Sequence, residues 1–203
     1  MKYRKDTDDS RIYPIENSCI FKKNDGEYGG LSNMASIFPL EINGMKIKSS
    51  EALYQACKFP NNSDLQKKII TTNSPFTAKM YAKGKDTRPD WFDIRIQVMR
   101  WCLRVKLAQN YHSFGKLLAM TKDNNIIEYS DRDTFWGAKK INEFELKGIN
   151  ALGRLLMELR QEVQTKNTDE ILVVPPPLII NFKLLGENIG TVDMRIKYKN
   201  LSS

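Results

Sequence analysis

One predicted helix places a carboxylate, an amide and an amine on a single face. In the stretch S-S-E-A-L-Y-Q-A-C-K-F, Glu51, Gln55 and Lys58 are separated by four and then three residues, the spacing of neighbours on a helix surface. Glu51 has the chemistry of a general acid or base, and Lys58 that of a cation or an amine nucleophile. Tyr54 lies between them, where its ring either stacks on a ligand or packs. A solvated helix face with a weak acid–base network explains the same pattern, so both interpretations stay open.

A second group of chemically active residues lies in the stretch S-D-R-D-T-F-W-G-A, which follows an apparent strand. Asp133 supplies a carboxylate, Trp136 supplies a ring, and Gly137 allows a backbone to approach a ligand closely. Asp131 is interpreted as a turn residue. An aspartate-rich turn with a packed tryptophan is the competing interpretation of the whole stretch.

Trp91 follows the predicted helix cap Asp90 and therefore lies in the first turn of a helix. There it either packs against the helix entrance or forms one wall of an anion site beside free backbone amides. Residues able to hydrogen-bond a ligand, or to let phosphate approach the backbone, occur at two further places: Gly30, Ser32 and Asn33 in a glycine-containing loop, and Asn150 and Gly153 at a helix start.

The chain is strongly basic, with 32 Lys and Arg against 24 Asp and Glu, a formal net charge of +8 and a pI near 9.3. Such a field attracts anions: phosphorylated metabolites, nucleic acid or a phosphate-bearing cofactor. Charge alone does not identify which of these the protein binds.

Several classes of site and of location are disfavoured. Three scattered cysteines and a single histidine, His112, give no metal-ligand spacing, and neither a G-x-G-x-x-G nor a phosphate-loop motif occurs, so we expect no metal and no cofactor. The polar N-terminus has no apolar signal core, and no run of 18 apolar residues is present. These features predict a cytoplasmic protein with reduced thiols and no membrane partner.

The elements that must position these residues indicate an α+β fold: a mostly helical single domain with a few short strands and a C-terminal β-hairpin appendage. Caps at Ser49 or Ser50, Asp64, Ser74 and Asp90 begin helices, and Asn43-Gly44 is a hairpin turn. Further helices are predicted at 114–120 and 150–163, strands at 18–21 and 125–129, and a hairpin turn around 186–188. We divide the chain into a flexible N-terminal arm (1–18), a main domain (19–165), and a linker with the β appendage (166–203).

The order of these segments resembles the NADAR family over about residues 21–163. The stretches that carry the resemblance are G-G-L-S-N, S-S-E-A-L-Y-Q-A-C-K-F, R-P-D-W, V-M-R-W-C-L-R-V-K-L-A-Q-N, D-T-F-W-G and G-I-N-A-L-G-R-L-L-M-E-L-R. The family includes an N-glycosidase acting on riboflavin-biosynthesis intermediates and hydrolases that remove ADP-ribose from guanine bases. One departure is visible: Ala52 stands where many members have histidine after the motif glutamate.

The resemblance implies that Glu51, Trp91 and Asp133 occupy the positions of a catalytic or substrate-contacting acid, tryptophan and acid. The other residues that match motif positions are Asn33, Lys58, Trp136, Gly137 and Asn150. It further implies a hydrolase that cleaves the sugar C1′–N bond of an ADP-ribose-type adduct, removing ADP-ribose from ADP-ribosylated guanine. Its partner would be an ADP-ribose-bearing substrate, including single-stranded DNA or RNA.

The residue types fit a glycosidase mechanism. Breaking a C1′–N bond builds positive charge on the sugar and negative charge on the nitrogen, so one carboxylate and one acid are expected, here Glu51 and Asp133 with their roles open. Lys58 either binds phosphate, pairs with Glu51, or attacks C1′ to form a Schiff base. Two alternatives remain: an N-glycosidase of phosphorylated riboflavin-biosynthesis intermediates, and a non-catalytic module that binds ADP-ribose or nucleic acid.

Overall fold

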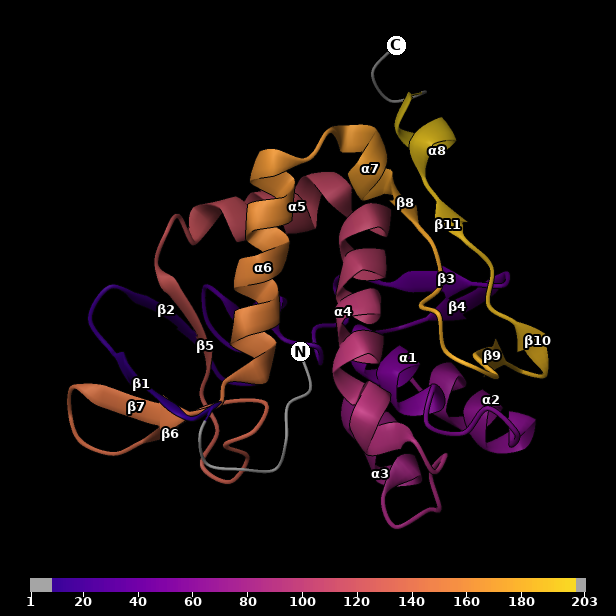
Figure 1. Ribbon diagram of the computed structural model, residues 1–203, viewed down its shortest axis with the longest axis horizontal. Helices are drawn as coiled ribbons and strands as arrows, with labels where there is room; N and C mark the ends of the chain where they lie inside the picture. The colour runs from indigo at the N-terminus through magenta and orange to yellow at the C-terminus, as the bar shows by residue number, and fades with distance from the viewer. Residues whose placement is uncertain (1–8, 200–203) are drawn as a thin grey trace.

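Helix α4 (Trp91–Gln109) runs through the middle of the molecule, with α6 (Ala151–Thr165) on one side and α1 (Ser50–Ala56) on the other (Figure 1). The computed structural model describes residues 9–199. Apolar side chains of α4 are buried on more than one face, including Trp101 and Cys102, which is typical of a helix in the centre of a core. The predicted fold class, a mostly helical α+β single domain, is confirmed.

The other helices surround this centre. They are α2 (Ser63–Thr71), α3 (Pro75–Ala82), α5 (Tyr111–Met120), α7 (Thr168–Leu172), α8 (Arg195–Lys199) and the short 3-10 helix η2 (Gly29–Leu31). Within residues 9–199, none of the helices is both long enough and apolar enough to cross a membrane.

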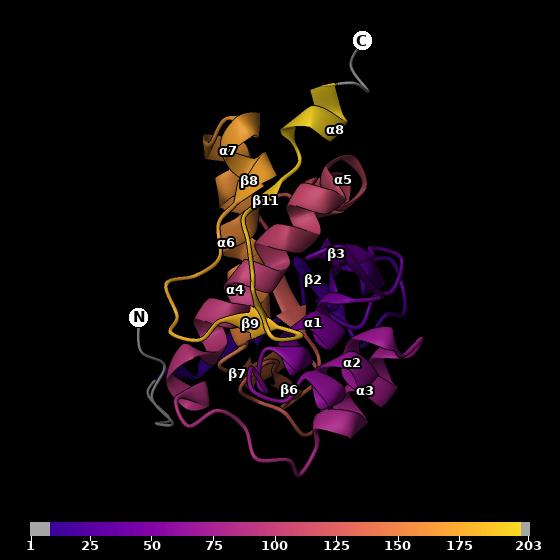
Figure 2. The ribbon, with the colours of Figure 1, turned by 90° about the vertical axis from the view of Figure 1, so that its right-hand side faces the viewer.

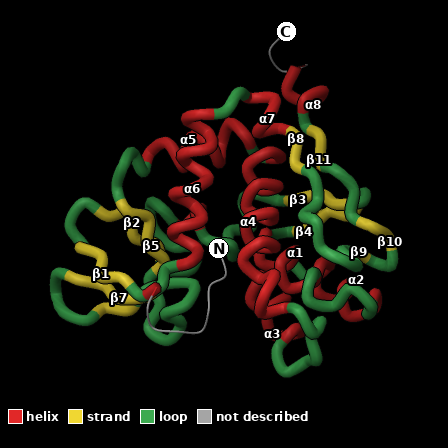
Figure 3. Tube along the Cα trace, in the orientation of Figure 1, coloured by secondary structure: helices red, strands yellow, loops and turns green. Residues whose placement is uncertain are grey.

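The strands are short and lie at the two sides of the helices (Figure 3). They are β1 (Arg11–Pro14), β2 (Ser18–Phe21), β3 (Leu40–Ile42), β4 (Met45–Ile47), β5 (Asn125–Glu128), β6 (Lys139–Lys140), β7 (Glu145–Gly148), β8 (Val173–Val174), β9 (Lys183–Leu184), β10 (Glu187–Asn188) and β11 (Val192–Asp193). β1, β7 and β6 form an antiparallel sheet in that order, and β2 pairs with β5 in parallel. The parallel pair joins two segments that are far apart in the sequence and leads directly into the loop that carries Asp133.

Most helix starts follow the predicted caps. Ser49 accepts the backbone N–H of Ala52 at the start of α1, and Ser74 accepts that of Thr77 at the start of α3. The Asp64 cap was wrong, because Asn62, two residues earlier, is the cap and α2 begins at Ser63. Asp90 precedes α4 as predicted, but its side chain makes no cap hydrogen bond, because it forms an ion pair with Arg88 instead.

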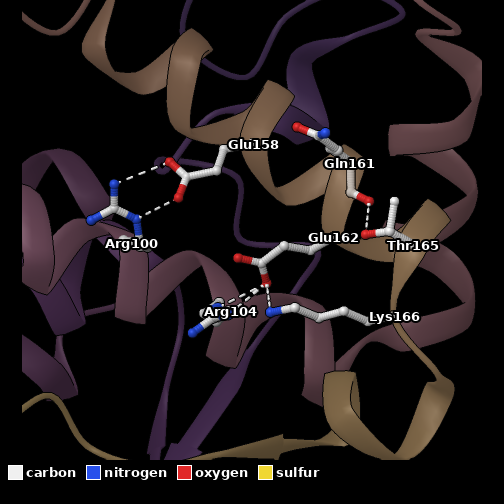
Figure 4. Close-up of polar contacts among 7 residues, drawn as sticks. All are labelled: Arg100, Arg104, Glu158, Gln161, Glu162, Thr165 and Lys166. Carbon is white, nitrogen blue, oxygen red and sulfur yellow. Dashed lines mark hydrogen bonds and ion pairs between the residues drawn. The ribbon is translucent and has the colours of Figure 1, made fainter.

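Charged side chains join α4 to α6 on the outside of the core (Figure 4). Arg100 donates two hydrogen bonds to Glu158, and Arg104 donates two to Glu162, which also pairs with Lys166. Partly exposed pairs of this kind contribute about 0.2–1 kcal/mol each, so they fix the register of the two helices more than they stabilise the fold.

The N-terminal segment differs from the predicted flexible arm. Residues 11–14 form β1, because their backbone pairs with β7 and the Tyr13 side chain is buried against Leu146 and Ile127. Residues 1–8 of the predicted arm lie outside the described residues.

The C-terminal segment is packed on the domain, where the sequence predicted an appendage. The predicted hairpin is present as β9 and β10, but its turn lies at Leu185-Gly186. Figure 2 shows the segment lying over α4, where Phe182 packs edge-on against Trp101 with a centroid separation of 5.0 Å. Gln66 of α2 donates to the carbonyl of Lys183 and accepts from the backbone of Leu185. The segment is therefore part of the core.

The close approach of α6 to β5 gives a stability prediction. A Cβ on Gly153 would lie 2.0 Å from the carbonyl oxygen of Ile126. Because this oxygen belongs to the backbone of β5, it cannot move aside as a flexible side chain can. Gly153→Ala should therefore lower the free energy of unfolding by about 1–3 kcal/mol. Gly115 of α5 is the matched control: its nearest neighbour would be 3.8 Å away, and Gly115→Ala should stabilise by about 1 kcal/mol. Urea unfolding measures both, and equal stability of Gly153→Ala and the natural protein would contradict the packing argument.

Candidate active site

Seven residues singled out from the sequence line one cleft of about 450 Å³. They are Asn33, Glu51, Tyr54, Lys58, Trp91, Asp133 and Trp136. They come from the loop after η2, from α1, from the first turn of α4 and from the loop after β5. Residues from four separate parts of the chain therefore converge at one place.

Glu51 is buried at the start of α1, with 7% of its surface exposed. Its backbone N–H donates to the carbonyl of Asn33 at 3.0 Å, and Ser50 Oγ donates to Asn33 Oδ1 at 3.1 Å. Gln55 Nε2, one turn along the helix, donates to Glu51 Oε1 at 2.8 Å. The Asn33 loop and the helix start thus hold each other in place and keep the carboxylate at the cleft.

Aromatic rings form a wall around Lys58. The ring of Tyr54 lies 5.0 Å from that of Trp91 and 5.6 Å from that of Trp136, centroid to centroid. Lys58 Nζ lies 5.5 Å from the Tyr54 ring and 5.4 Å from the Trp91 ring. Burial lowers the pKa of Lys58, and the charge of Glu51 offsets part of this. Such a wall can stack on a planar base, and its rings lie at cation–π distance from the Lys58 amine.

Asp133 both forms a turn and lines the cleft, the two roles that the sequence left open for its loop. Its Oδ1 accepts the backbone N–H groups of Phe135 and Trp136 at 3.1 and 3.0 Å, so it shapes the turn. The same carboxylate lines the cleft. Asp131, by contrast, forms an exposed ion pair with Lys22 outside the cleft, as expected of a turn residue.

Positive charge surrounds the cleft mouth. The cations that line it, beside Lys58, are Lys79, Lys83, Lys85 and Arg95. The Arg95 guanidinium stacks on the Phe135 ring at 3.7 Å, and its buried Nε has no hydrogen-bond partner within residues 9–199. A guanidinium with a donor unused is suited to bind an anionic group of a substrate. Arg95 was missed in the sequence, although it lies one helical turn after Trp91.

A second cleft, of about 690 Å³, adjoins the first and shares Lys58, Lys85 and Thr87 with it. Its far side is formed by Ile180 and Asn181 of the C-terminal segment. Arg88, whose side chain is 7% exposed, holds this segment by donating to the carbonyls of both residues. The two clefts together offer room for a ligand larger than one sugar and base.

Comparison with known proteins decides the family. The sequence matches the NADAR domain over residues 20–164. The chain belongs to the NADAR family. The resemblance inferred from its motifs is confirmed.

Its relatives include an N-glycosidase and a riboflavin biosynthesis protein. The chain is 33% identical over 145 residues to N-glycosidase YbiA of Escherichia coli (strain K12), covering 70% of this chain and 86% of that protein. It is 35% identical over 160 residues to a riboflavin biosynthesis protein of Vibrio vulnificus, covering 77% of this chain but only 41% of that protein. The NMR structure of E. coli YbiA matches with a TM-score of 0.60 at 30% identity, over 72% of this chain and 86% of that one.

Two predicted substrate-binding residues in the glycine-containing loop, Gly30 and Ser32, do not line the cleft. Lys106, buried in α4, donates from Nζ to the carbonyls of Gly30 at 2.7 Å and Ser32 at 3.0 Å. A Cβ on Gly30 would lie 2.6 Å from Leu117 Cδ2, and Ser32 Oγ accepts the backbone N–H of Met34. Both residues shape the loop that brings Asn33 to the cleft.

Three further predicted substrate-binding residues also lie outside the cleft lining. Gly137 is required because a Cβ there would lie 2.4 Å from the carbonyl oxygen of Glu128, and Gly153 packs against β5. Asn150 Nδ2 donates to the carbonyl of Ile126, and its Oδ1 accepts the backbone N–H of Glu128. Of the two uses the sequence allowed for Asn150 and Gly153, the structure shows close packing.

Glu128 lines the NADAR cleft and was not singled out in the sequence. It is the last residue of β5 and immediately precedes the loop that carries Asp133, which was the available signal. Burial and the charges of Asp133 and Glu51 raise its pKa to about 7, with Lys79 acting in the opposite direction. Within residues 9–199, no group of three or more His, Cys, Asp and Glu side chains is placed to hold a metal ion.

The cations at the cleft mouth give a binding prediction. Arg95→Gln should weaken the binding of inorganic pyrophosphate by about tenfold, since a charged donor at the cleft is lost. The control is Arg100→Gln on the same helix, because Arg100 lies outside the cleft and pairs with Glu158. Titration calorimetry at low and high salt measures both, and unchanged affinity in Arg95→Gln would show that this cleft is not an anion site.

Proposed function

We propose that this NADAR protein removes ADP-ribose from ADP-ribosylated guanine in nucleic acid or nucleotides by hydrolysing the sugar C1′–N bond. An N-glycosidase activity is that of its E. coli relative, and the chain is an enzyme of that class. The observation that carries the proposal is the convergence of Glu51, Trp91 and Asp133 on one cleft.

The cleft contains what cleavage of a C1′–N bond requires. Its carboxylates line the space that would hold the reacting sugar. From there they can stabilise a sugar cation and activate water. The rings of Tyr54, Trp91 and Trp136 offer stacking surfaces for the base and exclude water from it.

The charge and size of the cleft favour an ADP-ribose-type adduct. A pyrophosphate carries more than one negative charge, and five cationic side chains line the first cleft. The adjoining cleft gives room for the part of the substrate beyond the reacting bond. Phosphorylated riboflavin-biosynthesis intermediates remain the alternative, favoured by the names of several relatives, and they would use the same carboxylates.

The environment of Lys58 supports the amine route. No carboxylate of residues 9–199 forms an ion pair with Lys58, and burial lowers its pKa, while the charge of Glu51 acts in the opposite direction. A neutral amine in this position can attack C1′ of a ring-opened sugar, and water then releases the imine. We therefore propose that Lys58 is a nucleophile; single-stranded DNA or RNA as partner and a cytoplasmic location remain predictions from the sequence.

The substrate is tested by offering the purified protein two compounds separately. We expect loss of ADP-ribose from ADP-ribosylated guanine in single-stranded DNA, and slower or no cleavage of 5-amino-6-ribosylaminouracil phosphate, both followed by mass spectrometry. Glu51→Gln should reduce the rate by about 10²–10⁴-fold without unfolding, because the isosteric amide cannot act as acid, base or counter-charge. Tight binding without release of product would favour the binding-module alternative, and cleavage of neither compound would refute the proposal.

The covalent route makes its own prediction. Cyanoborohydride added during turnover should reduce a Lys58 imine to a stable amine, so peptide mass spectrometry should find the mass of the sugar moiety on Lys58. Lys79, a second lysine of the same cleft, is the internal control and should stay unmodified. Turnover without any adduct, together with an active Lys58→Arg variant, would show that Lys58 acts only as a cation.

A further inference from the structure

Three carboxyl groups share the cleft, although the sequence indicated two. Glu51 comes from α1, Glu128 from the end of β5, and Asp133 from the loop that follows β5. A glycosidase needs one carboxyl group that holds a proton at the working pH and one that is ionised. Which group has which role is decided by the environment of each, and the three environments differ here.

Glu51 and Asp133 both act as hydrogen-bond acceptors in the resting protein. Glu51 Oε1 accepts the amide of Gln55 at 2.8 Å. Asp133 Oδ1 accepts two backbone N–H groups, from Phe135 and Trp136. An ionised carboxylate has only acceptors, and these donors match that form.

Glu128 has a different environment. Among residues 9–199, no group donates a hydrogen bond to its carboxyl oxygens and no cation forms an ion pair with them. Its backbone is fixed, because its N–H donates to Asn150 Oδ1 and its carbonyl accepts the N–H of Ala138. The side chain is thus held at the cleft by its backbone while its carboxyl group stays free to bind a ligand.

The charges that face Glu128 also favour the protonated form of its carboxyl group. Asp133 and Glu51 are the negative groups, Lys79 of α3 is the positive group, and Lys58 and Arg95 line the same cleft from the end of α1 and from α4. With burial, the two carboxylates raise the pKa of Glu128 to about 7. A phosphate bound at Lys79 would remove the positive charge that opposes this rise.

We propose that Glu128, rather than Glu51 or Asp133, is the catalytic acid that protonates the departing nitrogen; this rests on the N-glycosidase function proposed above. As the C1′–N bond breaks, its electron pair goes to the nitrogen, which takes the proton of the Glu128 carboxyl group. The nucleophile, the Lys58 amine or water, forms the new bond to C1′ and releases a proton to Glu51 or Asp133. In the amine route, water then hydrolyses the C1′ imine and frees Lys58; in either route, Glu51 or Asp133 passes its proton to solvent and Glu128 regains one.

The rate of the reaction should depend on pH through the Glu128 carboxyl group. The reaction needs protonated Glu128, so kcat of the natural protein should fall as the pH rises through about 7. Glu128→Gln should lower kcat by about 10²–10⁴-fold, leave KM within a few-fold, and abolish this alkaline limb. Glu128→Asp keeps an acid in a shorter side chain and should recover part of the rate together with the limb.

The matched control is Asp131→Asn, which removes an exposed carboxylate three residues further along the chain and outside the cleft. Its rate and pH profile should equal those of the natural protein. A merely structural role of Glu128 would lower kcat without changing the shape of the profile, and that result would overturn the proposal. A kcat of Glu128→Gln within about threefold of the natural value, far below the loss expected for a general acid, would overturn it too.

A measurement without substrate separates this proposal from the proposed function. In protein labelled with carbon-13 at the glutamate carboxyl carbons, NMR titration should show one signal that titrates near pH 7 and disappears in Glu128→Gln or Glu128→Asp. A Glu128 signal that titrates in the ordinary glutamate range would overturn the proposal even if hydrolysis occurs. Absence of any hydrolysis by the natural protein would instead refute the proposed function, and the catalytic role of Glu128 with it.

Discussion

The geometry of the cleft depends on Asn150 more than on any other single residue. Its backbone is left-handed, with φ 52°, and its side chain bridges the carbonyl of Ile126 and the N–H of Glu128. Its own N–H donates to the carbonyl of Gly137. One residue thus ties β5, the start of α6 and the loop of Asp133 together. Asparagine is suited to this place because it tolerates the left-handed conformation and supplies both a donor and an acceptor.

Local signals predicted most of the long helices and one hairpin turn, but they did not predict how the strands pair. The Ser49 and Ser74 caps and the Asn43-Gly44 turn depend only on neighbouring residues, and each was found. The parallel pairing of β2 with β5 joins positions more than a hundred residues apart, and β1 depends on β7. The strands β2 and β5 were themselves predicted, whereas β1 was not, because this short segment gains its strand conformation from its pairing with β7.

The candidate site shows the same division between residue type and environment. Glu51 was found by its helical spacing with Gln55 and Lys58, Asp133 by the aromatic residues and glycine beside it, and both by the family resemblance. Glu128 lies at the end of an apolar strand, N-I-I-E, where a partly buried acid has no distinct pattern. Its pKa is raised first by burial in the fold and then by the two carboxylates that α1 and the loop after β5 bring near it. The sequence shows which residues are acidic, whereas burial and neighbouring charges in the fold decide which carboxyl group has a raised pKa.

The C-terminal segment lies outside the family match but borders the candidate site. The NADAR match ends at residue 164, yet residues 180 and 181 form one side of the cleft that adjoins the reacting one. Arg88, next to the R-P-D-W motif, holds them through their carbonyls, so the segment is positioned by the domain itself. In the proposed function, the carboxylates lie within the residues that match the family, and part of the adjoining cleft lies outside them. The proposed substrate would therefore also meet residues that the family match does not include.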